Sequence, residues 1–188
     1  MILLSHGTAG IELGHSSPTE AFAQRDYLVA ALPHPGDNFQ DTSLRDGTGS
    51  VGAPYFTQRP LQVSQVIDAL LRDPLWKDRV ASDSNGHRIR AVVAMSPASV
   101  MFTPDSLARI TVPTLLYRAE KNRFLVPRFH VGWLVQNMPH TQAVSMPLTR
   151  RFAFMDTPSM PLMTPDGDVG AGAPGCDRSV FLEKLGLN

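Results

Sequence analysis

An α/β fold with a mostly parallel sheet of about five strands flanked by helices is the fold class that the sequence predicts. Short apolar runs bounded by glycine, proline and polar residues alternate with segments whose apolar residues recur at helical spacing. Because parallel strands need a crossover between them, this alternation favours a parallel sheet covered by helices. The 188 residues suit one core, so we expect residues 1–188 to form a single domain.

Five apolar runs are the expected strands: Ile2 to Leu4, Tyr27 to Leu32, Ala91 to Met95, Thr114 to Tyr117 and Ala143 to Met146. Runs this short, without polar alternation, are typical of strands that are buried on both faces. A parallel sheet has no central gap, so we expect Ala91 to Met95 to lie beside Ile2 to Leu4.

Helical spacing predicts five helices: Pro18 to Gln24, Pro60 to Leu71, Pro104 to Ile110, Phe129 to Asn137 and Asp177 to Leu185. We expect Pro60 to open its helix, because proline is well tolerated in a first turn. The segment from Pro33 to Arg59 shows neither period, which predicts a long loop. Turn-forming residues between Trp76 and Ile89 predict a polar connector there.

Charge and cysteine content exclude several classes of partner. The chain has 17 Lys plus Arg and 17 Asp plus Glu, so it has no basic field to attract nucleic acid. Cys176 is the single cysteine and cannot form an internal disulfide, and no histidine pair has metal-site spacing, so we expect no metal. The opening apolar run is too short for a signal or a membrane span. We therefore expect a cytoplasmic protein that does not enter membranes.

Polar segments follow the strands, at the edge where parallel sheets bind ligands. They include Ser5-His6-Gly7-Thr8-Ala9-Gly10 and His34-Pro35-Gly36-Asp37-Asn38; three further characteristic segments are Arg59-Pro60-Leu61-Gln62-Val63-Ser64, Val126-Pro127-Arg128-Phe129-His130 and Phe152-Ala153-Phe154-Met155-Asp156. Over nearly the whole chain, these segments resemble the predicted dienelactone hydrolase group of the α/β-hydrolase fold. The resemblance implies a reduced form of that fold and an ester or lactone hydrolase. Its chemistry would use Ser, an acid and His in that chain order, and we expect no cofactor.

The resemblance also implies a role for the loop after the first strand. In the family this loop supplies a backbone N–H to the oxyanion, and here its residues are Gly7, Thr8 and Ala9. The alternative is an ordinary strand-to-helix turn, since glycine is the usual residue in tight turns. Two histidines, His6 and His34, lie in loops that can face the same cleft, whereas His15, His87, His130 and His140 are expected in solvent.

The family's catalytic positions are altered in this chain. The family's G-x-S-x-G elbow falls between Trp76 and Ile89, where this sequence has only the short connector, so we expect a chain truncated relative to the family. The nearest substitute, Ser50, follows no apolar strand, and Ser96 follows one as a candidate substrate contact or an ordinary strand-end serine.

The acid and histidine positions are altered as well. The acid position is occupied by Asn122, with Glu120 as a substitute if the loop is shifted, and the histidine position by Arg151. An arginine cannot act as a general base near neutral pH.

Two hypotheses of function remain. The first is an ester or lactone hydrolase with an atypical catalytic arrangement. The second is a catalytically inactive relative that binds a small ligand, such as a carboxylate held by Arg151, with Glu120 as the internal partner of that arginine. Loss of the elbow strand would leave an apolar patch beside Pro60 to Leu71, so we expect self-association into a homo-oligomer.

Overall fold

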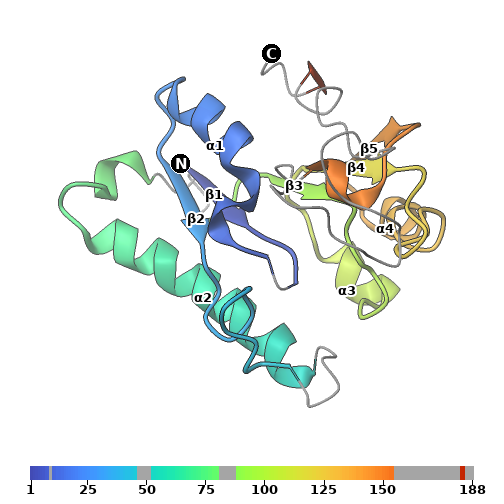
Figure 1. Ribbon diagram of the computed structural model, residues 1–188, viewed down its shortest axis with the longest axis horizontal. Helices are drawn as coiled ribbons and strands as arrows, with labels where there is room; N and C mark the ends of the chain where they lie inside the picture. The colour runs from blue at the N-terminus through green and yellow to red at the C-terminus, as the bar shows by residue number, and fades with distance from the viewer. Residues whose placement is uncertain (9, 46–51, 81–87, 155–182, 185–188) are drawn as a thin grey trace. The chain divides into compact units, whose positions relative to one another are not determined.

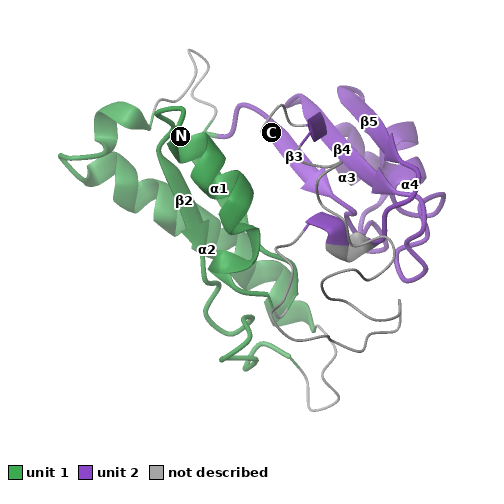
Figure 2. Cartoon of the chain, turned by 45° about the horizontal axis from the view of Figure 1, so that its top comes forward, with its two compact units in different colours: residues 1–88 green, residues 89–188 purple. Residues whose placement is uncertain are grey.

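The computed structural model describes residues 1–8, 10–45, 52–80, 88–154 and 183–184, without the side chains of 151 and 152 (Figure 1). Its strands and helices form a mixed α/β structure in which every strand pair is parallel, as expected. The chain divides into two compact units, Met1–Arg88 and Ile89–Asn188 (Figure 2). Each unit carries its own parallel sheet flanked by helices.

The first unit contains a two-stranded sheet made of β1 (Ile2–Ser5) and β2 (Val29–Leu32). A short 3-10 turn, η1 (Glu12–His15), and helix α1 (Ser16–Ala23) connect the two strands. Ile2 lies opposite Val29 and Ser5 lies opposite Leu32, so both strands end at the same edge. The polar residues that follow each strand are therefore brought together.

Helix α2 (Ala53–Arg72) begins seven residues before Pro60, which therefore lies inside the helix. The expectation that Pro60 opens this helix is wrong, because Pro54 already occupies the first turn, where its missing N–H is not needed. The long loop is correspondingly shorter than expected. Since the extra turns are helical, Arg59 belongs to the helix and is one of its buried residues. A short 3-10 turn, η2 (Lys77–Arg79), follows α2.

The second unit contains a three-stranded parallel sheet in the order β3 (Val92–Met95), β4 (Thr114–Ala119) and β5 (Thr141–Met146). Helix α3 (Pro104–Ala108) connects β3 to β4, and α4 (Val131–Asn137) connects β4 to β5. The expectation that β3 pairs with β1 is wrong: the described strands form two sheets. All four residues of β3 are instead in register with β4, which satisfies their backbone groups on that side.

Buried side chains cluster on both sides of β4. Leu116 packs with residues of α3 and α4, and Tyr117 packs with residues of β5 and of the 3-10 turn η3 (Arg151–Phe154). Successive residues of a strand point to opposite faces of the sheet, and here both faces are covered. This explains why apolar residues stand at successive positions of β4. Most of the expected closing helix lies outside the described residues. No helix within the described ranges is both long enough and apolar enough to cross a bilayer.

Candidate functional site

Ser5 and His34 lie at the edge where β1 and β2 end. Ser5 is the last residue of β1, and its Oγ lies 2.8 Å from His34 Nε2. The His34 side chain is fully buried, and its backbone φ of 48° lies in the left-handed region, which few residues other than glycine adopt. Ser5 is exposed. The hydroxyl of an exposed serine is thus held against a fixed imidazole.

Gln62 of α2 holds the other side of the His34 ring. Gln62 Nε2 donates to Pro35 O over 2.8 Å, which leaves Gln62 Oε1 to accept from His34 Nδ1, also at 2.8 Å. Because that oxygen only accepts, the Nδ1 atom carries the hydrogen, and Nε2 is left with a lone pair facing Ser5. This tautomer is the one in which histidine can take a proton from a serine.

Arg59 sets the direction of the Ser5 hydrogen bond. Its Nη2 donates to Ser5 Oγ over 3.0 Å and also to the backbone oxygen of His6. A guanidinium has no acceptor, so Ser5 must accept from Arg59 and is free to donate its own hydrogen to His34. The positive charge beside Ser5 Oγ also favours the alkoxide over the neutral hydroxyl.

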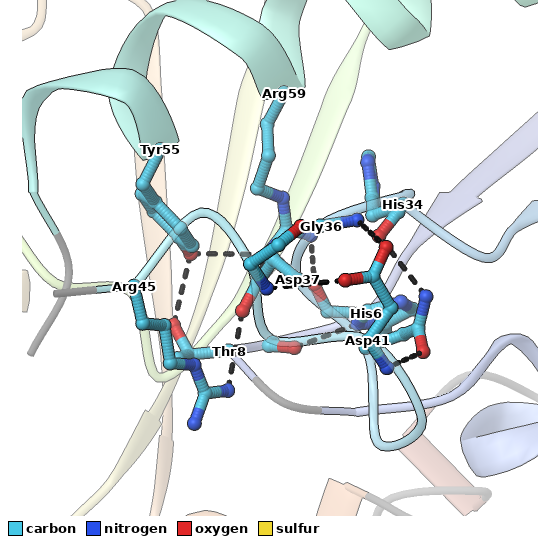
Figure 3. A network of polar contacts seen from close by, with 12 residues as sticks. His6, Thr8, His34, Gly36, Asp37, Asp41, Arg45, Tyr55 and Arg59 are labelled. Carbon is cyan, nitrogen blue, oxygen red and sulfur yellow. Dashed lines mark hydrogen bonds and ion pairs between the residues drawn. The ribbon is translucent and has the colours of Figure 1, made fainter. Parts of the chain in front are cut away.

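Asp37 anchors Arg59 in this position (Figure 3). Its carboxylate is fully buried and lies 2.7 Å from Arg59 Nη1 and 3.2 Å from Arg45 Nη2. Gly36, which precedes Asp37, has a φ of 84°, and its backbone N–H donates to Asp41 Oδ2 over 2.6 Å. The loop after β2 is therefore fixed by its own turn, and its carboxylate is directed at α2.

The environment of His34 keeps its ring neutral. Burial lowers the pKa of His34 below its ordinary value of 6.5, and the nearby charges of Arg59 and His6 lower it further. The hydrogen bond that His34 donates to Gln62 and the charge of Asp37 act in the opposite direction but do not prevail. His34 is consequently available as a base at neutral pH and somewhat below it.

The expected oxyanion loop lies next to Ser5. A methyl group added at Gly7 would meet no atom of the described chain within 4 Å, so there is open space beside this residue. Thr8 is exposed, and its Oγ1 lies 2.9 Å from the Tyr55 hydroxyl of α2 (Figure 3). His6 is buried, with its ring nitrogens against the backbone oxygens of Gly7 and Pro33. Ala9 lies outside the described residues.

The expected acid positions belong to the second unit and have local partners. Asn122 is buried, and its Oδ1 accepts from the backbone N–H groups of Phe124 and Leu125, at 3.1 Å and 2.8 Å, so this oxygen stabilises its own loop. Glu120 Oε1 lies 3.0 Å from Arg118 Nε and 2.5 Å from Ser145 Oγ. These local contacts occupy the groups that were expected to orient a catalytic histidine.

Three other sequence candidates have different outcomes. Ser96 follows β3 with a φ of 47°, and its Oγ is buried without a hydrogen-bond partner among the described residues. Arg151 lies in η3, and its side chain is outside the described part of the chain, so its expected pairing with Glu120 stays a prediction. Ser50 also falls outside it.

A second serine and histidine pair, Ser99 and His130, was not expected from the sequence. The Ser99 backbone N–H donates to His130 Nδ1 over 3.1 Å, and Ser99 Oγ donates to the Phe129 backbone oxygen over 3.1 Å. His130 is buried rather than solvated, because it anchors this loop, and burial lowers its pKa. Ser99 is only 1% exposed, so the pair stabilises its loop and is inaccessible to a substrate.

The other expected solvent histidines have mixed outcomes. His15 is buried at the end of η1, where it belongs to the compact turn before α1, so this expectation is wrong. His140 is exposed as expected, and His87 lies outside the described residues. Within the described ranges, no three His, Cys, Asp or Glu side chains cluster as a metal site would require.

Comparisons of the chain with protein families, with curated proteins and with solved structures return no match. The resemblance to the dienelactone hydrolase group therefore stays a prediction.

The sequence contained a signal for part of this site that went unused. Ser5 is the first residue and His34 the second residue after a predicted strand, and the carboxyl ends of adjacent parallel strands meet at one edge. Arg59, Gln62 and Tyr55 gave no such signal, because their positions depend on where α2 begins.

Proposed function

We propose that this protein is an ester or lactone hydrolase in which Ser5 is the nucleophile and His34 is the general base. The observation that carries the proposal is the 2.8 Å contact between Ser5 Oγ and the unprotonated Nε2 of a buried histidine. A nucleophile within hydrogen-bond reach of a base that a third group orients is the arrangement that serine hydrolases share.

The proposed reaction is acyl transfer to water. Ser5 Oγ attacks the carbonyl carbon as its proton passes to His34 Nε2, and the resulting oxyanion lies toward Gly7 and Thr8. The ester C–O bond then breaks, and His34 returns the proton to the leaving alcohol. Water then attacks the acyl-enzyme while His34 takes one of its protons; the bond between Ser5 Oγ and the acyl carbon breaks, His34 returns that proton to Ser5 Oγ, and the carboxylic acid is released.

Gln62 is the third member of the hydrogen-bonded chain that begins with Ser5 and His34. With an amide at this position, the site is a slower catalyst than a site with a carboxylate there. Gln62 Oε1 holds the ring in the right tautomer, but an amide does not neutralise the imidazolium that forms during attack. The charge of Arg59 opposes that imidazolium as well. We therefore expect slow turnover compared with a serine hydrolase that has an aspartate at this position.

The same observation favours a second candidate function, a catalytically inactive relative that binds a small ester, lactone or carboxylate. A site whose third member is neutral would keep its hydrogen bonds to a ligand while losing most of its chemistry. Under this alternative, replacing Ser5 would change ligand affinity and no turnover would be found.

Hydrolysis of p-nitrophenyl acetate and of a simple lactone, with covalent labelling by a fluorophosphonate, separates the two functions. We expect turnover, and labelling on Ser5 itself as located by peptide mass spectrometry. Ser5→Ala and His34→Asn should each abolish both signals. Asparagine is the choice at His34 because it tolerates a positive φ while its side chain is too short to reach Ser5.

Ser106→Ala is the matched control, since Ser106 is a half-buried serine in α3 of the second unit whose hydroxyl donates to the backbone oxygen of Thr103. Its activity and labelling should equal those of the unmodified protein. Silence of the unmodified protein in all three assays, or labelling at another serine, would rule out the proposed enzyme.

A further inference from the structure

A second chain of hydrogen bonds starts at Arg59 and ends at Thr8. Arg59 Nη1 donates to the Tyr55 hydroxyl over 3.0 Å, and that hydroxyl lies 2.9 Å from Thr8 Oγ1. Its direction follows from donor chemistry. Because Arg59 can only donate, Tyr55 accepts from it, and among the described residues the Tyr55 hydrogen has only Thr8 to bind.

The last group of this series of hydrogen bonds, the Thr8 hydroxyl, therefore has a hydrogen that it can donate. Thr8 Oγ1 accepts from Tyr55, so its own hydrogen is left to donate to a further group. The residue is exposed, and Figure 3 shows its contact with the Tyr55 hydroxyl as a dashed line. A group that binds at this edge of the first unit can reach that hydrogen.

The two chains share one guanidinium. Arg59 contacts Ser5 Oγ through Nη2 and the Tyr55 hydroxyl through Nη1, both at 3.0 Å. Thr8 follows Ser5 by three residues, so their Cα atoms are at most about 10 Å apart. The proposed nucleophile and the donor hydroxyl are thus set in place by the same buried cation.

We infer that the Thr8 side-chain hydroxyl donates a hydrogen bond to the carbonyl oxygen of the ester or lactone, and that Tyr55 is a positioning residue that orients it. The inference rests on the proposed function. It adds a side-chain donor to the backbone N–H that the family resemblance implies for this loop. Because Tyr55 orients the Thr8 hydroxyl before the substrate binds, this hydroxyl stabilises the oxyanion of the transition state more than the carbonyl of the bound substrate. Its loss should therefore affect kcat more than KM.

Steady-state kinetics with p-nitrophenyl acetate on four variants test this inference. Thr8→Val removes the hydroxyl with little change of shape and should lower kcat about 100-fold, with KM changed less than about twofold. Thr8→Ser keeps the hydroxyl and should retain most of the activity. Tyr55→Phe should lower kcat about fivefold, the value of one neutral hydrogen bond.

The double variant with both Thr8→Val and Tyr55→Phe should be no slower than Thr8→Val, because Tyr55 acts through Thr8. Thr57→Val is the matched control, since Thr57 is an exposed threonine of α2 whose hydroxyl contacts only backbone oxygens of its own helix.

The outcomes distinguish this inference from the proposed function. If Ser5→Ala abolishes turnover while Thr8→Val keeps more than half of the original kcat, the Thr8 assignment fails and the hydrolase stands. A Thr8→Ser variant as slow as Thr8→Val, or additive losses in the double variant, would also overturn it. Absence of any turnover that depends on Ser5 would overturn both.

Discussion

Asp37 Oδ2 and Arg59 Nη1 form a buried ion pair at 2.7 Å that joins the loop after β2 to the N-terminal half of α2. The Asp37 carboxylate is fully buried, and the Arg59 side chain is 10% exposed. Through this pair, the guanidinium is held where it contacts both Ser5 and Tyr55. The geometry of the proposed site therefore depends on an interaction outside the reacting groups.

Asp37→Asn should destabilise the protein strongly. Removing one charge of a buried pair leaves the other uncompensated, which costs about 3–5 kcal/mol of the free energy of unfolding. Urea denaturation followed by circular dichroism measures the change. The matched control is Asp68→Asn, which breaks the 2.8 Å pair with Arg88, where both side chains are more than a third exposed. Its cost should stay below about 1 kcal/mol, and equal costs for the two variants would contradict a buried role for Asp37.

The pH dependence of turnover should report the protonation of His34. Only the neutral ring accepts a proton from Ser5, and the pKa of His34 is lowered from 6.5, so kcat/KM should hold its plateau down to a pH below 6.5. Gln62→Glu places a carboxylate against Nδ1, which favours the charged ring, and should move the acidic limb of the profile to higher pH.

Gln65→Glu provides the control for this pH profile, because Gln65 is an exposed residue of the same helix. Its profile should match that of the unmodified protein. An acidic limb above 6.5 in the unmodified protein, or no shift in Gln62→Glu, would show that His34 is not the base.

Gly36→Ala should lower stability by about 2–3 kcal/mol. A Cβ at this position would lie 2.4 Å from Leu44 Cγ, and the φ of 84° is unfavourable for any residue with a side chain. Thermal unfolding compares it with Gly52→Ala, where the nearest atom to a new Cβ is Pro54 Cδ at an ordinary 3.5 Å. A Gly36→Ala protein as stable as the Gly52→Ala protein would mean that the loop after β2 is not held in this turn.

Self-association is expected through the exposed apolar residues of α2 and its C-terminal end. Leu61 is 53% exposed and Leu75 is 79% exposed, and burial of these side chains against a second copy would stabilise a dimer. Size-exclusion chromatography with light scattering should show a mass that rises with concentration. Leu61→Gln combined with Leu75→Gln should reduce the association, whereas Leu148→Gln, equally exposed at 78%, should not. A clean monomer at high concentration would refute the expectation.

The local elements could be predicted from the sequence because each depends on its own residues. Apolar runs such as Val92–Met95 and Thr114–Ala119 form strands at the expected places, with ends shifted by one or two residues. Helix α4 likewise lies within its expected segment. The exception is the start of α2, because a proline at position 60 suggested a helix start while Pro54 already supplied one. Two prolines compatible with one helix leave its start undetermined by local preference.

The sequence by itself determined the α/β class, the parallel direction of the strands and the edge at which polar residues collect, because apolar periodicity and chain direction fix all three. Only the tertiary structure decided which strands share a sheet and which polar residues meet. Strand pairing and the approach of α2 to the strand ends are long-range packing outcomes, and Ser5, His34 and Arg59 come together only through them. A hydrogen bond between residues 29 or 54 positions apart leaves no periodic trace in the chain.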